Sequence, residues 1–168
     1  MNFVEVVNAT RTAVDEELVA RLVAGVLEAE GVRRAEVGVD FVGEARMRAL
    51  NRDHRHRDEI TDVLSFPLED RDPRRGRRGA EPAEAADPPA GASEPPLMLG
   101  DLVICLRQAL RQAAADALPP ALEVAVLLTH GTLHLLGYDH ETDAGQMALR
   151  QAELLELVDW EGLVVASR

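Results

Sequence analysis

The chain has 168 residues, enough for one domain with a substantial core but not for two. Its 30 acidic and 18 basic residues give a formal net charge of −12, which argues against a whole surface that binds nucleic acid but not against a local basic cleft. No apolar run reaches the about 18 residues of a membrane span, the N-terminus lacks a secretory pattern, and the single Cys105 cannot form an internal disulfide, so we expect a cytoplasmic protein.

The first part of the chain predicts a strand and an amphipathic helix. Residues 2–7 are typical of a strand. Thr12 and Asp15 resemble a capping box at the start of a helix that ends near Gly31. The apolar residues of that helix recur at helical spacing and form one stripe: Leu18, Val19, Leu22, Val23, Val26 and Leu27.

The next elements are a half-buried strand, a short helix and a third strand. Apolar residues alternate with Glu, Gly and Asp over Ala35–Phe41, which predicts a strand with one face in the core. Gly43–His54 predicts a short helix that turns Met47 inward. Thr61–Phe66 predicts a third strand, which Pro67 ends.

The composition changes abruptly between Leu68 and Leu97. This segment is rich in Pro, Gly and Ala, carries an arginine run at 74–78, and has almost no large apolar residues. Such a segment cannot offset its ordering entropy, so we predict a disordered insertion at about 68–97. Its arginines could contact RNA, or the segment could be a tolerated low-complexity insertion.

The remainder predicts one strand and three helices. Met98–Cys105 has strand character, Leu106–Ala117 is helical, and a helix apolar nearly all round begins at Pro120. Thr142 or Asp143 would cap the last helix. Four residues of that helix would pack inward: Met147, Leu154, Leu155 and Val158.

The order of these elements predicts an α+β fold. We expect a single domain over 1–168, in which a four-stranded sheet is covered by about five helices and the apolar helix is central.

Three histidines near the end of the central helix indicate a metal site. His130 and His134 are four residues apart and therefore lie on one face of the helix. Gly137 can adopt the left-handed conformation that ends a helix, so the chain can turn back and present His140 as a third ligand. Three neutral imidazoles leave one tetrahedral position open, as in a catalytic zinc site. Asp139 would either orient a ligand histidine or hold this turn.

The histidine spacing matches that of a known protease class, but one residue of the motif differs. Offsets of 0, 4 and 10 with glycine at offset 7 match the metzincin proteases, but Gly131 stands where those enzymes have a catalytic glutamate. The motif therefore predicts a metal-dependent hydrolase that lacks the base of a peptidase.

A second polar group precedes the third strand. Residues 51–67 hold His54, His56 and several arginines. These arginines could form a positive wall beside the metal, where guanidinium groups grip phosphate, or they could be a solvated helix end.

Three blocks of the sequence carry a family resemblance. His130–His140 reads HGTLHLLGYDH, Asn51, Arg55 and Thr61–Pro67 form a second block, and Leu99–Asp101 followed by an apolar strand forms a third. In these blocks the chain resembles the YbeY-type endoribonucleases, bacterial rRNA maturation factors. The family hallmark HGxLHLxGYDH matches at every fixed position, and the blocks follow the order of the family and span the chain apart from the insertion.

The resemblance implies one Zn²⁺ held by His130, His134 and His140, which with Arg55 would form the catalytic site. It implies cleavage of single-stranded RNA in maturation of the 16S rRNA 3′ end and in ribosome quality control, with the small ribosomal subunit as partner and no DNA substrate. Arg55 matches the functional arginine of the family. His54, His56, Cys105 and the long insertion depart from the usual pattern and leave the substrate contacts open.

The implied reaction is metal-assisted phosphodiester hydrolysis, with Arg55 offsetting the charge that develops on the phosphate. The residues identify no general base, so metal-activated water and the substrate's own 2′-hydroxyl both stand as nucleophiles. Two alternatives stay open: a metalloprotease-like hydrolase of a non-nucleic substrate, and a non-catalytic ribosome assembly factor that zinc stabilises.

Overall fold

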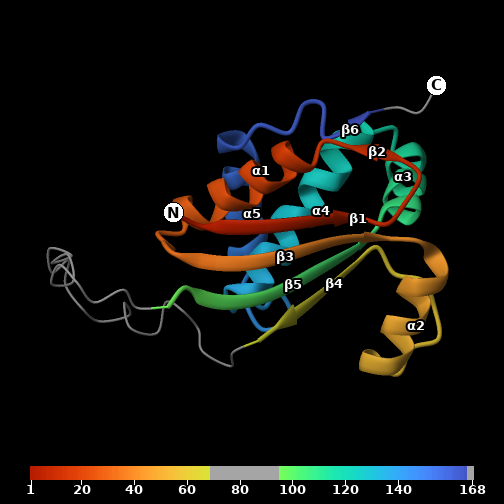
Figure 1. Ribbon diagram of the computed structural model, residues 1–168, viewed down its shortest axis with the longest axis horizontal. Coiled ribbons are helices and arrows are strands. Elements are labelled where there is room, and N and C mark those ends of the chain that lie inside the picture. Colours follow the sequence, from red (N-terminus) through yellow and green to blue (C-terminus); the bar gives the residue numbers. More distant parts are fainter. Residues whose placement is uncertain (69–94, 166–168) are drawn as a thin grey trace, which may run out of the picture.

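The computed structural model describes residues 1–68 and 95–165, in which helices pack against a β-sheet (Figure 1). The predicted insertion thus lies mostly outside the described residues. The elements in chain order are β1 (Phe3–Asn8), β2 (Ala13–Val14), α1 (Glu16–Ala29), β3 (Ala35–Val42), α2 (Glu44–Arg55), β4 (Val63–Pro67), β5 (Leu97–Cys105), α3 (Leu106–Ala115), α4 (Pro120–Leu135), α5 (Gln146–Leu157) and β6 (Val164–Val165).

The main sheet has four strands in the order β1-β3-β5-β4. β1 pairs with β3 and β3 with β5 in parallel, whereas β4 pairs with β5 antiparallel. This confirms the predicted α+β class with a four-stranded sheet and five helices. Because β4 stands at an edge, one side of its backbone faces away from the sheet.

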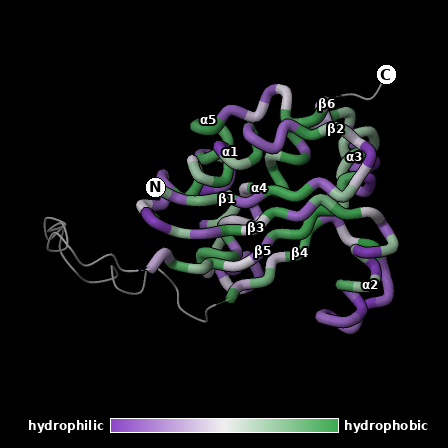
Figure 2. The backbone as a smooth tube through the Cα atoms, in the orientation of Figure 1, coloured by the Kyte–Doolittle hydropathy of each residue, from purple (hydrophilic) through white to green (hydrophobic). Residues whose placement is uncertain are grey.

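One face of the sheet carries the main core. Buried residues of α1, α3, α4 and α5 form one cluster with inward residues of β3 and β5. α4 lies between the sheet and the outer helices, as its apolar sequence predicts, and Val124, Leu128 and Leu133 are fully buried. The hydropathy colouring shows this helix among apolar neighbours (Figure 2). Among the described helices, the one that bears two of the histidines therefore has the most buried residues.

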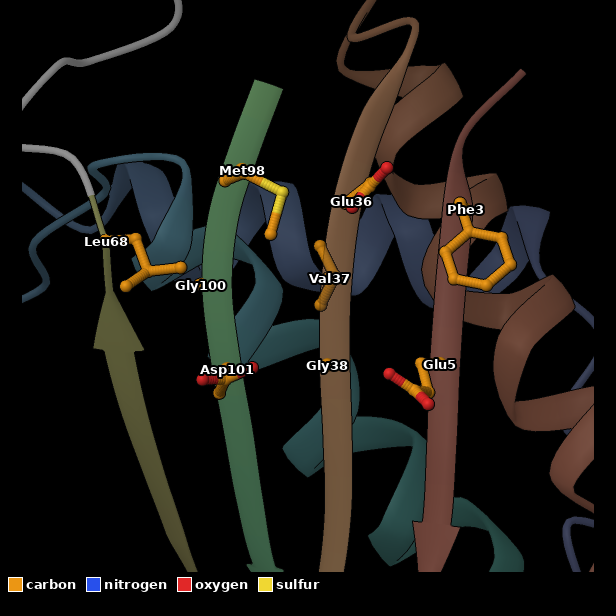
Figure 3. Close-up of a pocket in the computed structure, with 9 residues that line it drawn as sticks. All are labelled: Phe3, Glu5, Glu36, Val37, Gly38, Leu68, Met98, Gly100 and Asp101. Carbon is orange, nitrogen blue, oxygen red and sulfur yellow. The ribbon is translucent and has the colours of Figure 1, made fainter. Parts of the chain in front are cut away.

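The opposite face of the sheet is only partly covered. α2 packs there through Met47, which joins Leu64 and Val103 in a second, smaller cluster. Beyond α2, no helix of the described residues covers this face, and a shallow pocket on it is lined in part by Glu5 and Asp101, whose side chains lie on the side away from the helices (Figure 3). The pocket and the histidines therefore lie on opposite sides of the sheet.

Gly100 explains the glycine of the third family block in structural terms. Its φ is +130°, and an added Cβ would lie 2.1 Å from the backbone oxygen of Phe66 on β4. The pairing of β3 with β5 also shifts register here, because Glu36 pairs with Met98 and Val37 with Gly100. The bulge lets Leu99 and Leu102 both enter the core.

Three predicted boundaries were wrong. The capping box is absent, because Asp15 is the N-cap of α1 and accepts the Leu18 N–H at 2.9 Å, while the residues after Thr12 form β2 and pair with β6. α5 begins after Gly145 rather than at Thr142, although the Asp143 carboxylate does accept the Met147 N–H at 2.7 Å.

The third boundary is the end of the insertion. Leu97 belongs to β5, where it pairs with Ala35 of β3, so the insertion ends before it.

The helices of the described residues were also compared with the length and hydropathy of a membrane span, and none of them meets both.

Candidate metal centre

The three histidines of the motif converge at the C-terminal end of α4. The Nε2 atoms of His130 and His134 are 3.0 Å apart, and the Nδ1 of His140 lies 3.2 Å from the Nε2 of His134. The first two rings are half-buried and the third is exposed. Within residues 1–68 and 95–165 this is the one group of three or more ligand side chains that could hold a metal ion.

The turn that returns His140 to the helix is built as the sequence predicts. Gly137 has a φ of +85°, the left-handed conformation that suits glycine. The Asp139 carboxylate accepts the Glu141 N–H at 3.0 Å and the Thr142 hydroxyl at 3.1 Å. These two donors hold the pKa of Asp139 below its ordinary value. Asp139 therefore holds the turn, one of its two predicted roles.

The donor set fits a divalent metal. The Nδ1 of His134 faces the backbone oxygen of Tyr138 at 2.9 Å, and the Nδ1 of His130 faces the Oε1 of Gln151 at 2.9 Å. Both partners can only accept, so each Nδ1 carries the proton and each Nε2 presents a lone pair. Two lone pairs 3.0 Å apart repel each other unless a cation lies between them. Tetrahedral zinc with bonds of about 2.0–2.1 Å would separate its nitrogen ligands by about 3.3 Å, close to the observed spacing.

Burial favours the neutral form of the central ligand. The pKa of His134 is lowered chiefly by desolvation and further by the neighbouring His130. A metal binds the neutral imidazole. Because its pKa is lowered, His134 stays neutral, and able to bind a metal, at a lower pH than a free histidine does.

A polar network ties the turn to the helices around it. The Tyr138 hydroxyl donates to Glu30 at the end of α1 at 2.8 Å, and Arg150 of α5 donates to the same carboxylate at 2.6 Å. The Glu30 side chain is only 6% exposed, so this charge is paired inside the protein. The network fixes Tyr138, whose backbone oxygen orients His134.

Gly131 faces the sheet rather than the histidine rings. An added Cβ would lie 2.8 Å from Leu102, 3.3 Å from the Ser65 hydroxyl and 3.4 Å from Val63. Ser65 also donates to the Gly131 backbone oxygen at 3.3 Å. β4 is thus close to the histidine helix, and the position where a metzincin has its glutamate is filled by packing against β4 and β5.

Gly131→Glu is therefore expected to destabilise the protein without creating a protease. Overpacking of this contact costs about 1–3 kcal/mol, and a buried carboxylate adds to that cost. Urea unfolding measures the loss, and casein hydrolysis checks for a peptidase. Gly43→Glu is the matched control, because nothing lies within 4 Å of a Cβ at that exposed position. Equal stability of the two variants would contradict the packing assigned to Gly131.

Most arginines in and beside the second polar group, residues 51–67, face acidic side chains. Arg48 forms a two-bond ion pair with Asp58 at 2.8 Å, and nearby Arg52 and Arg57 also face acidic side chains. Arg55, the last residue of α2, is exposed, and within the described ranges its side chain forms no hydrogen bond or ion pair.

The structure brings neither Arg55 nor the other two histidines into contact with the three-histidine cluster. The His54 ring meets Phe66 edge-on at 4.9 Å, and His56 ends α2 with a φ of +57°. Cys105 is fully buried and packs as a small residue in the cluster that Met47 joins.

Sequence reasoning missed Gln151, which contacts His130. The signal was present, because Gln151 lies four residues after Met147 and three before Leu154 on the inward stripe of α5. A polar residue between two buried apolar ones on a helix face indicates a polar partner inside. The network of Glu30, Tyr138 and Arg150 had no comparable signal, since it joins segments far apart in the chain.

Fold and site together define an α+β protein with a cluster of three histidines that could hold a metal ion. A family model described as Endoribonuclease YbeY matches residues 5–159. The chain belongs to this family. An Endoribonuclease YbeY of Macrococcus caseolyticus is 39% identical over 140 residues, which cover 82% of this chain and 81% of that protein. One from Anaeromyxobacter sp. (strain Fw109-5) is 41% identical over 146 residues, 86% of this chain and 64% of the longer relative.

A solved structure also resembles the fold. The solution structure of TM1509 from Thermotoga maritima aligns with a TM-score of 0.58 at 23% sequence identity, over 92% of this chain and 87% of that one. At this identity the likeness concerns the fold alone.

Proposed function

We propose that this chain is a cytoplasmic, zinc-dependent endoribonuclease that cuts single-stranded RNA in maturation of the 16S rRNA 3′ end and in ribosome quality control. Its partner would be the small ribosomal subunit. The observation that supports the proposal best is the convergence of three histidine nitrogens, at 3.0 and 3.2 Å, in a member of the Endoribonuclease YbeY family. A protease is disfavoured because Gly131 stands where a metzincin has its catalytic glutamate, and an added Cβ there would lie only 2.8 Å from Leu102.

His130, His134 and His140 would hold the ion. When bound, zinc supplies Lewis acidity toward a phosphoryl oxygen and lowers the pKa of water. The rings contribute no charge of their own, so the bound site is cationic and attracts a phosphodiester. The exposed His140 leaves the open side of the cluster accessible from solvent, whereas α4 and α5 shield the buried side. RNA would therefore approach from the side of the 138–145 turn.

Arg55 would supply the second positive charge. Its neighbours are neutralised by local acids, so Arg55 is the arginine of the α2 end that remains available for an external anion within the described ranges. α2 and α4 pack on opposite faces of the sheet, but β4 is the edge strand between them. A single strand of RNA that crosses the free edge of β4 could touch both faces, and a guanidinium there would grip its phosphate.

The test combines metal analysis and cleavage on one sample. Protein purified without chelators or metal-affinity resin is expected to carry one equivalent of zinc and to cut single-stranded RNA. A chelator should remove both the metal and the activity, and added Zn²⁺ should restore them. Metal-loaded protein that leaves single-stranded RNA intact would favour the assembly factor, and cleavage that survives complete metal removal would contradict the proposed site.

A further inference from the structure

α5 contributes a side chain to the metal centre from outside the three-histidine motif. We propose that Gln151 is a positioning residue, which holds the ring of His130 so that its Nε2 faces the ion. The inference rests on the metal site proposed above and extends it by a residue that sets the affinity for the metal.

The contact with Gln151 determines which ring nitrogen of His130 carries the proton. The Gln151 Oε1 lies 2.9 Å from the Nδ1 of His130. An amide oxygen can only accept, so Nδ1 donates its proton and Nε2 is left with the lone pair that binds a metal. If the amide were turned over, its NH₂ group would meet Nδ1, and the proton would move to Nε2. The ring could then no longer bind a metal through the nitrogen that faces His134 at 3.0 Å.

The position of Gln151 in the fold is determined by packing. Met147 and Leu154, on the same stripe of α5, are 1% and 0% exposed, so this stripe is pressed against the core. Asp143 accepts the Met147 N–H and fixes the start of the helix. A half-buried amide in such a stripe is costly unless it has a partner, and His130 of α4 is that partner. The contact thus joins α5 to α4, and both helices are packed in the core.

Gln151 holds a role that no other side chain shares in the described part of the chain. His134 is oriented by the backbone oxygen of Tyr138, and His140 contacts His134. Among residues 1–68 and 95–165, Gln151 is the one side chain outside the three histidines that forms a hydrogen bond with a histidine of the cluster. Loss of an outer partner of this kind typically weakens metal binding about 10–100-fold.

The experiment separates orientation from packing. Gln151→Met keeps the length of the side chain but removes the strong acceptor, whereas Gln151→Glu keeps an acceptor in the same place. Gln146→Met, an exposed residue at the start of the same helix, is the control. Zinc affinity is measured by competition with a chromophoric chelator. The visible spectrum of the Co²⁺ form reports the ligand geometry, and the melting temperature of the metal-free protein reports packing.

We expect Gln151→Met to bind zinc about 10–100-fold more weakly and to show an altered Co²⁺ spectrum. Gln151→Glu should bind at least as tightly as the wild type, because a carboxylate accepts the same N–H more strongly. The control should match the wild type in both measurements. The melting temperature of the metal-free protein should change little in any variant.

Two results would overturn the inference while leaving the proposed function intact. One is zinc affinity in Gln151→Met within about threefold of the wild type, well below the loss expected for an outer partner. The other is an equal loss of affinity in Gln151→Met and Gln151→Glu, with a lower melting temperature in both, which would mark a packing role. A wild-type protein that binds no metal at the histidines would overturn both this inference and the proposed function.

Discussion

His134→Ala is expected to abolish both metal binding and RNA cleavage. His134 is the middle ligand, since its Nε2 faces both His130 and His140, and removing it leaves two rings with no shared neighbour. The loss of affinity should exceed the about 10–100-fold that follows removal of an outer partner. Elemental analysis after dialysis gives the metal content, and a single-stranded RNA substrate gives the rate.

The control for this prediction is His54→Ala. His54 lies on α2, outside the cluster, where its ring packs on Phe66. It should keep a full equivalent of metal. Retention of metal in His134→Ala would place the ion elsewhere. If His134→Ala unfolded, and the wild type lost its circular dichroism in chelator and showed no cleavage in zinc, then the zinc-stabilised assembly factor would be the better account.

The convergence of the three histidines was predictable because its determinants are local. The offsets of His130, His134 and His140 place two rings on one helix face, and Gly137 permits the reversal that returns the third. Helical periodicity and the conformational range of glycine suffice for that argument. The four main strands were predictable for the same reason, since alternation and apolar runs are local patterns.

The parts that escaped prediction depend on contacts between distant segments. β2 and β6 are two-residue strands whose pairing joins residues about 150 positions apart, so neither carries a pattern of its own. Because Ala13 and Val14 pair with β6, α1 starts later than the Thr12 capping box implied. The side of the sheet on which α2 packs was also hidden, because it depends on how the chain crosses from β3 to β4.

Arg55→Glu is expected to abolish cleavage of single-stranded RNA while leaving the metal content unchanged. The substitution replaces a cation that could bind phosphate with a group that repels it. Arg55 is exposed and lies at the C-terminal end of α2, so reversing its charge should lower stability only by the about 0.3–1 kcal/mol of a helix-end interaction. Arg55→Lys keeps the charge but loses the two-bond grip, and should retain partial activity.

The measurement is the cleavage rate at matched zinc occupancy, with circular dichroism as a check on folding. Arg11→Glu serves as the control, because Arg11 is an exposed arginine in the loop between β1 and β2, and the net charge changes equally. Rising salt should slow the wild type through the release of counterions. α2, which ends at Arg55, packs on the face of the sheet opposite α4, so the expected loss of cleavage requires RNA to cross the edge strand β4. A rate close to that of Arg11→Glu would mean that the substrate stays on the histidine side and that Arg55 lies outside the site.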